Sequence, residues 1–193
     1  MKTLYTLVLI FGSIFSQAQH LKNYQFYNQK GKKIEVEKLA TALANYDIVL
    51  FGEHHNNSVN HWLQLQVLKQ LHQKFGQNLH IGFEMFERDN QTQLSDFVNQ
   101  KIDDKTFQDS TRLWNNYKTD YKPLVEFAKT HHLKTIATNV PRRYASQVAK
   151  EGLESLNQLD DQDKKWMVKL PFQIDYDAPG YPEMIKMMGE HAG

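Results

Sequence analysis

Glutamate and histidine side chains gather directly after a short apolar run in the first third of the sequence. Glu53 and His55 follow the run 47–52 and are two residues apart, so both can point to one side of an extended strand. His61 lies six residues further, in the first turns of the helix that we expect next. Carboxylate and imidazole groups can hold a divalent metal ion, and Glu53 could then act as a general base. Metal-dependent hydrolysis is therefore open, although the spacing is not that of an H-E-x-x-H helix.

A second acidic residue lies inside an apolar run, where an unpaired charge is costly. Glu84 belongs to the run 79–86, and burial of its carboxylate without a partner would cost several kcal/mol. We therefore expect Glu84 to have a partner or a chemical role. Arg88, Arg142 and Arg143 could neutralise this carboxylate, or the carboxylate of a ligand.

Three apolar runs predict the strands that position these residues. The runs are short enough for buried strands, and they cover 47–52, 79–86 and 133–138. Apolar residues three or four apart predict a helix over 59–75 that stops at Gly76. Further helices are expected over 91–100, over 123–132 and from Pro141 to about Gly152, with helix or loop over 102–122.

This alternation of strands and helices predicts one α/β domain over residues 19–193, with a mostly parallel sheet flanked by helices. Ligands of such sheets bind beyond the carboxyl ends of the strands. The polar residues named above follow or end the predicted strands, so we expect them to meet at that edge. Their joint placement is the main argument for a functional site.

Composition excludes several classes of function. The 193 residues carry 23 Lys and Arg against 22 Asp and Glu, and a net charge of +1 gives no electrostatic case for nucleic-acid binding. The absence of cysteine removes disulfides, thiolate metal sites and lipid attachment through Cys. No G-x-S-x-G elbow, P-loop or G-x-G-x-x-G motif occurs, which argues against serine hydrolases, NTPases and dinucleotide enzymes.

The N-terminus has the pattern of a secretory signal peptide. Lys2 precedes an apolar run from Leu4 to Phe15, and Ser16 and Ala18 then supply small residues at the spacing that signal peptidase requires. The run is shorter than the ~20 residues of a membrane span. We therefore expect residues 1–18 to be removed and the mature protein to be periplasmic or secreted.

Several short motifs occur in a fixed order between residues 45 and 193. They are FGEHHNN at 51–57 followed by His61 and Gln64, GFEMF at 82–86 followed by Arg88 and Gln91, Trp114 with Tyr121-x-Pro123, NVPR at 139–142, and MGEHAG at 188–193. The ordered set resembles the ChaN-like haem-binding proteins, a family first described as iron-regulated lipoproteins. The family is related to the erythromycin-esterase and Tiki group.

The resemblance implies an α/β domain that binds haem, in facing pairs between two protomers of a homodimer. It implies iron ligation by a tyrosine, histidines that help to hold the haem and its propionates, and outer-membrane haem-uptake machinery as a partner. The matching motif positions are Glu53, His55, His61, Glu84 and Arg142, and the candidate tyrosines are Tyr121, Tyr144, Tyr176 and Tyr181. Kinship with the esterase group associates Glu53 and His55 with hydrolysis.

Two features of the sequence depart from the family pattern. The lipoprotein cysteine is absent, so tethering to a membrane through Cys does not carry over. The chain also ends at Gly193, where similar proteins continue, and we expect the domain to be C-terminally incomplete.

Three interpretations of the polar residues follow. We expect an exported haem-binding protein of iron acquisition, with Arg88, Arg142 and Arg143 available for propionates. The alternative is a metal-dependent hydrolase that uses Glu53, His55 and His61. The third interpretation is an interaction protein in which these residues only cap helices and tie strands together.

Overall fold

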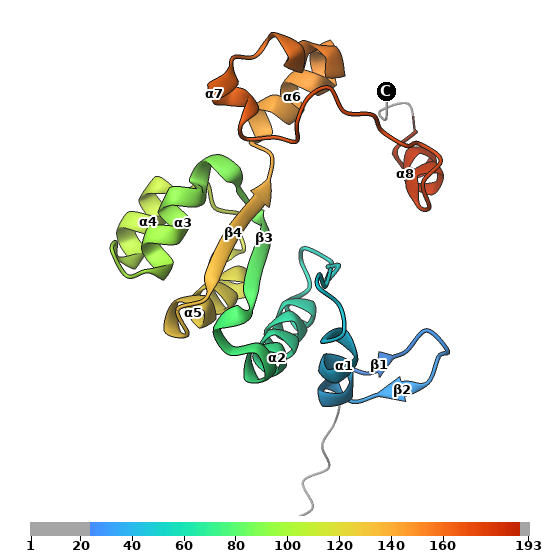
Figure 1. The fold of residues 1–193 in the computed structure, drawn as a ribbon, viewed down its shortest axis with the longest axis vertical. Helices are drawn as coiled ribbons and strands as arrows, with labels where there is room; N and C mark the ends of the chain where they lie inside the picture. Colours follow the sequence, from blue (N-terminus) through green and yellow to red (C-terminus); the bar gives the residue numbers. More distant parts are fainter. Residues whose placement is uncertain (1–23, 190–193) are drawn as a thin grey trace, which may run out of the picture. The chain divides into compact units, whose positions relative to one another are not determined.

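The computed structural model describes residues 24–189, which fall into two compact units divided after Glu35 (Figure 1). In the first unit, β1 (Phe26–Tyr27) pairs antiparallel with β2 (Lys33–Ile34). The side chain of Asn28 accepts hydrogen bonds from the backbone N–H groups of Lys30 and Lys32, which closes the turn of this hairpin. The predicted signal peptide lies outside the described residues. No helix in the described part of the chain is long and apolar enough to cross a membrane.

The second unit begins with two helices, of which the longer one confirms the helix predicted before Gly76. After α1 (Val36–Leu43), α2 runs over Ser58–Phe75. The Asn57 side chain caps its first turn by accepting from the backbone N–H of Asn60, and Gly76 ends it. Val67, Leu68 and Leu71 are buried on its inner face, together with His61.

A parallel pair of strands forms the sheet, as predicted. β3 (His80–Glu87) pairs with β4 (Lys134–Asn139), and Gly82 faces Ile136 in the register. The connection between the strands contains α3 (Gln91–Val98), α4 (Asp104–Ser110), the π-helical turn η3 (Tyr117–Tyr121) and α5 (Lys122–Thr130). Short 3-10 turns, η1 (Gly76–Asn78) and η2 (Arg88–Asn90), flank β3. The α/β class is therefore confirmed.

The first predicted strand, 47–52, is wrong. These residues have no strand structure, and Ile48 and Leu50 leave 77% and 92% of their surface exposed. A short apolar run becomes a strand only where a neighbouring strand satisfies its backbone hydrogen bonds. In the described residues, β3 pairs with β4 alone, so the run stays irregular.

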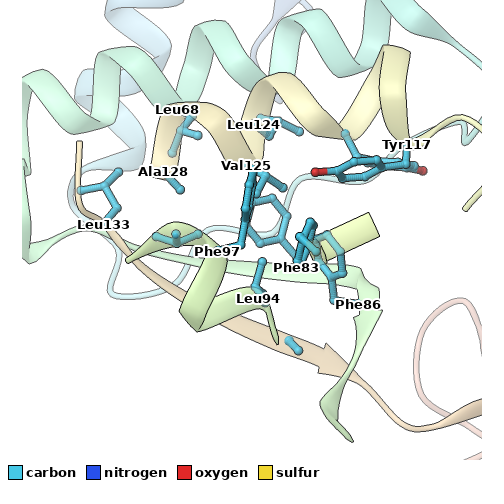
Figure 2. Packing of buried hydrophobic residues seen from close by; sticks show 14 residues of the cluster. Leu68, Phe83, Phe86, Leu94, Phe97, Tyr117, Leu124, Val125, Ala128 and Leu133 are labelled. Atoms are coloured by element: carbon cyan, nitrogen blue, oxygen red, sulfur yellow. The ribbon is translucent and has the colours of Figure 1, made fainter. Parts of the chain in front are cut away.

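The hydrophobic core lies between the helices and one face of the sheet. Side chains from α2, α3, α5 and both strands converge there (Figure 2), among them Leu68, Phe83, Leu94, Val125 and Ala137. The rings of Phe97 and Phe107 stack with centroids 4.5 Å apart, which joins α4 to this core. On the opposite face of the sheet Gly82, Glu84 and Ile136 are exposed.

The outer edge of β4 is occupied by a side chain rather than by another strand. Gln91 donates from Nε2 to the carbonyl of Thr135 (3.0 Å), and its Oε1 accepts from the backbone N–H of Ala137 (2.7 Å). One residue of a neighbouring parallel strand would make the same two hydrogen bonds. Gln91 therefore protects the edge at this position.

The last elements follow β4. Helix α6 (Arg142–Glu151) begins after Pro141 and ends at Gly152, as predicted. The turn η4 (Leu153–Gln158) and the helices α7 (Asp161–Lys164) and α8 (Tyr181–Met188) follow it.

Candidate functional site

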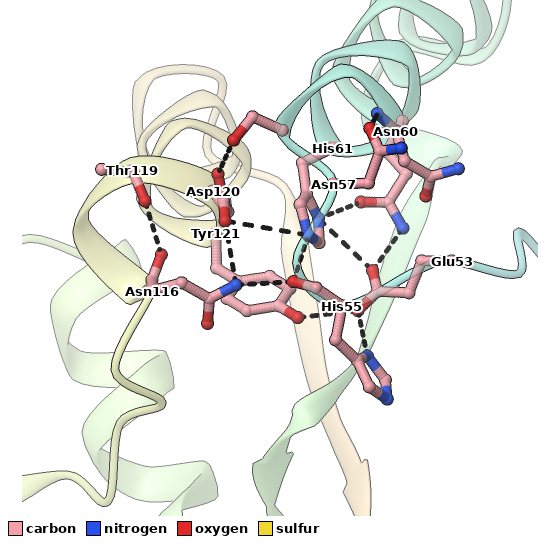
Figure 3. A network of polar contacts seen from close by, with 11 residues as sticks. Glu53, His55, Asn57, Asn60, His61, Asn116, Thr119, Asp120 and Tyr121 are labelled. Atoms are coloured by element: carbon pink, nitrogen blue, oxygen red, sulfur yellow. Dashed lines mark hydrogen bonds and ion pairs between the residues drawn. The ribbon is translucent and has the colours of Figure 1, made fainter.

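Glu53 is the centre of a polar network between the start of α2 and the turn η3 (Figure 3). Its Oε1 accepts from the Tyr121 hydroxyl (2.7 Å) and from Nδ1 of His55 (2.8 Å). Its Oε2 accepts from the Gln64 amide (2.7 Å). Only 7% of the Glu53 side chain is exposed, so these three donors satisfy a nearly buried carboxylate.

His61 is buried beside this carboxylate, with 2% of its surface exposed. Its Nδ1 lies 3.0 Å from Oε1 of Gln64 and 3.4 Å from Oε2 of Glu53. Its Nε2 lies 3.0 Å from the carbonyl oxygen of His55. Both ring nitrogens thus lie within hydrogen-bond distance of oxygen atoms of the network.

The π-helical turn η3 supplies the other side of the network. It carries Asp120 and Tyr121, both buried, and π-helical turns occur frequently at functional sites. Asp120 accepts from the Ser58 hydroxyl (3.0 Å) and from the Asn116 amide (2.9 Å), and Asn116 also donates to the His55 carbonyl (2.7 Å). These contacts fix the loop that carries Glu53 and His55 against η3.

The pKa values of Glu53 and Tyr121 are shifted in opposite directions. Burial raises the pKa of Glu53, but hydrogen bonds from His55, Tyr121 and Gln64, with His61 nearby, lower it below its ordinary value. Burial raises the pKa of Tyr121, and its hydrogen bond to the Glu53 carboxylate raises this pKa further. Glu53 is therefore the anionic member and Tyr121 the neutral donor.

A depression of about 360 Å³ lies at the carboxyl ends of the two strands. It is lined by Met85, Glu87, Trp114, Asn139, Val140, Arg142, Ala145, Ser146 and Ala149. Trp114 connects it to the network, because its ring lies 5.0 Å from that of His55 and 6.3 Å from that of Tyr121. A larger cavity of about 600 Å³, along the outer edge of β4 and the end of α3, shares no residue with either.

The three arginines of the sequence analysis have different surroundings. Arg142 lines the depression. Arg143 is bound to Asp89, and its guanidinium stacks 4.4 Å from the centroid of the Tyr144 ring. The hydrogen bond to Asp89 raises the pKa of Arg143. Arg88 is exposed in η2 and does not line the depression. Arg142 is therefore the arginine placed to meet a ligand there.

The candidate tyrosines fall into two groups. Tyr121 and Tyr144 are buried, and each donates its hydroxyl to a carboxylate: Tyr121 to Glu53, and Tyr144 to Asp163 (2.6 Å). Tyr176 and Tyr181 are exposed, by 57% and 37%, and their rings contact each other edge to face. The structure brings only Tyr121 into the network of Glu53.

Glu84 is not buried, so of the two expectations for it, a partner or a chemical role, only the role stays a prediction. Its side chain is exposed on the face of the sheet that the core does not cover. Water can therefore hydrate the carboxylate, and no arginine is needed to neutralise it. Among the described residues, no ion pair or hydrogen bond joins it to another side chain. The residues of this strand that line the depression are Met85 and Glu87, and Glu87 is the acidic one.

No group of three or more His, Asp or Glu side chains in the described part of the chain is arranged to hold a metal ion. Glu53, His55 and His61 do come together, but Gln64 and the His55 carbonyl engage both nitrogens of His61. His61 therefore serves the network through hydrogen bonds.

Sequence reasoning missed Asn116 and Asp120, and it gave no role to Gln64 or Trp114. Asn116 and Asp120 lie in the segment 102–122, where no periodic pattern indicated which side chains face inward. The one available signal was the spacing of His61 and Gln64, which places both side chains on the same side of a helix.

Comparison with known proteins gives one match. The family model described as haem-binding uptake, Tiki superfamily, ChaN, matches residues 39–193. No curated protein and no solved structure matches the chain significantly.

Proposed function

Because the chain belongs to the ChaN family of haem-binding uptake proteins in the Tiki superfamily, we propose that it is an exported haem-binding protein of haem and iron acquisition. The family match spans both the Glu53 network and the depression beside it. The proposed ligand is iron protoporphyrin, which has a flat apolar ring, two propionates and an iron atom that needs a protein ligand.

The depression at the carboxyl ends of the strands is the observation that carries this proposal. Met85, Trp114 and Val140 offer apolar surface to the ring, and Arg142 offers a cation to a propionate. Haem supplies the iron chemistry when bound; the residues of the chain bind it, orient it and exclude water from one side. The lining residues fit the apolar ring and a propionate of this group.

Export and partners extend the proposal. The leader over residues 1–18 would direct the protein to the periplasm or the medium, where outer-membrane haem-uptake machinery is the natural partner. A homodimer with facing haems would cover the exposed side of each bound ring.

A titration of the mature protein with hemin, followed in the Soret region, tests the proposal. We expect a saturable shift. Arg142→Ala should raise Kd by about tenfold, because a hydrogen bond to a charged group contributes about 1.5 kcal/mol. Arg88→Ala is the matched control, since Arg88 is exposed outside the depression, and it should leave Kd unchanged. A wild-type protein without a saturable shift would refute haem binding.

Metal-dependent hydrolysis is the second candidate function. The observation that favours it is the convergence of Glu53, His55 and His61, in which Glu53 could act as a general base. Metal binding by His61 would require one of its hydrogen bonds, to Gln64 or to the His55 carbonyl, to break. Metal analysis of the purified protein and an ester panel with added zinc or manganese test this candidate. Stoichiometric metal, with activity lost in Glu53→Gln, would support it, and a metal-free inactive protein would reject it.

A further inference from the structure

We infer that the depression at the carboxyl ends of the strands selects haem and other porphyrins with two carboxylates over porphyrins with four, an inference that rests on the proposed function. Glu87 is the residue that determines this preference. Its carboxylate belongs to the lining of the depression, where a further ligand carboxylate would meet a like charge.

An irregularity in β3 places Glu87 in this lining. Phe83 pairs with Ala137. The next pair joins Glu87 to Asn139, so a step of four residues in β3 matches a step of two in β4. Phe86 is buried together with Phe83, although the two are three residues apart and a regular strand buries every second residue. Bulges of this kind re-aim side chains and are over-represented next to active sites. Glu87 therefore lies opposite Asn139, and both residues line the depression.

The Glu87 carboxylate is held in place by Arg112. Nε of Arg112 donates to Oε2 of Glu87 (2.9 Å), and 18% of the Glu87 side chain is exposed. Arg112 also binds Asp89, and Asp89 binds Arg143 as well. In this group the two positive charges are balanced by the two carboxylates, so it offers no excess positive charge to a ligand.

Arg142 is the basic residue in the lining of the depression. Among residues 24–189, no ion pair joins it to another side chain, so its charge is available to a ligand. The two propionates of haem leave neighbouring pyrrole rings at one edge of the porphyrin, and one guanidinium can serve that edge. The lining thus supplies a cation for one carboxylate edge, and Glu87 is the charged residue of the remaining lining.

A porphyrin with four carboxylates has no uncharged edge to turn toward Glu87. In coproporphyrin III, propionates replace the two vinyl groups of haem, so every pyrrole ring carries a carboxylate. Whichever edge Arg142 holds, further carboxylates come to a surface that carries a negative charge. Like charges repel strongly there, and carboxylates that lose water without a partner add a further cost. The apolar vinyl groups of haem suit Met85 and Trp114 instead.

Titrations of the full chain with hemin and with iron coproporphyrin III, followed in the Soret region, test this preference. We expect Kd for iron coproporphyrin III to exceed Kd for hemin by at least about tenfold. Glu87→Gln should reduce this ratio to less than about threefold, because the negative charge is removed. Glutamine keeps the size of the side chain and an acceptor for Arg112, so a preference based on size would survive this change.

A second variant and a third porphyrin serve as controls. Glu151→Gln removes the same charge from an exposed position at the end of α6, outside the lining, and should leave the ratio unchanged. Iron mesoporphyrin keeps two propionates and has ethyl groups in place of the vinyl groups, so it should bind like hemin. Mesoporphyrin binding as weak as that of coproporphyrin would assign the preference to the vinyl groups and overturn the role of Glu87.

Circular dichroism checks the folding of each variant. If Glu87→Gln does not fold, Arg112→Gln replaces it, because loss of the arginine leaves Glu87 unpaired and should raise the ratio above that of the wild type. A wild type that binds both porphyrins equally, or a ratio that the folded variant leaves unchanged, would overturn the inference and leave haem binding intact. A wild type without saturable hemin binding would instead overturn the proposed function.

Discussion

Glu53 links the loop before α2 to the turn η3, because its nearly buried carboxylate lies beside four side chains of the network. It accepts from Tyr121, His55 and Gln64, and it lies 3.4 Å from Nδ1 of His61. Removal of such an acceptor leaves buried donors without a partner, which costs more than the loss of the hydrogen bonds alone. The network therefore stabilises the protein and also orients His55.

The stability that Glu53 contributes should depend on pH. Its folded-state pKa is lowered from the ordinary 4.5, so its contribution is fully present above pH 4.5 and is lost as pH falls through the lower folded value. Glu53→Gln should therefore reduce the free energy of unfolding at pH 7 by about 1–3 kcal/mol, and by less at pH 3. Urea unfolding at the two pH values measures this difference.

Glu84→Gln is the matched control, since that glutamate is exposed on the open face of the sheet. It should change stability by less than about 0.5 kcal/mol at either pH. An effect of Glu53→Gln that is equally large at both pH values would contradict the assignment of Glu53 as the anion of the network.

At the scale of elements, local pattern was sufficient for some predictions and insufficient for others. Helix α2 and strands β3 and β4 follow from apolar spacing, caps and stop signals that lie within each element. The run 47–52 has the same local pattern as a strand, but strand formation depends on a partner that its own sequence does not specify. Exposure of Glu84 depends likewise on which face of the sheet the helices cover.

Part of the site was also not predicted, because it depends on contacts between residues far apart in the sequence. The meeting of Glu53 and His55 with His61 follows from residues close together in the sequence, and it was predicted. The contact of Tyr121 with Glu53 joins residues 68 positions apart, and it needs the π-helical register of η3. No periodicity in the segment 102–122 indicated that register.

Gln91 gives a test of the sheet edge. Gln91→Ala removes the two hydrogen bonds to Thr135 and Ala137, and we expect a loss of about 1–3 kcal/mol in the free energy of unfolding. Hydrogen exchange should also accelerate at the amide of Ala137, because its acceptor is gone. Thr92→Ala, an exposed change on the same helix, should leave this exchange rate unchanged. Continued slow exchange at Ala137 in Gln91→Ala would show that another group protects the edge.

At the scale of the whole molecule, the proposed role in haem acquisition depends on the proposed export. The apolar run at the N-terminus is too short to span a membrane, and the small residues Ser16 and Ala18 after it have the spacing of a signal-peptidase site. The candidate site lies well after the predicted leader, so removal of residues 1–18 would take away no residue that we assign to haem. The location of the protein can therefore be tested separately from its binding.

Expression of the full sequence in a Gram-negative host, followed by intact mass spectrometry of the periplasmic fraction, tests export. We expect the mature chain to begin at Gln19, because signal peptidase requires small side chains at the last and third-last leader positions. Ala18→Leu places a large side chain at the last position and should leave the leader attached. Gln17→Leu is the matched control, since the intervening position tolerates large residues, and it should be processed normally. A wild-type chain that still carries Met1 would contradict export by this route, while hemin binding by the same chain would show that the haem site works without it.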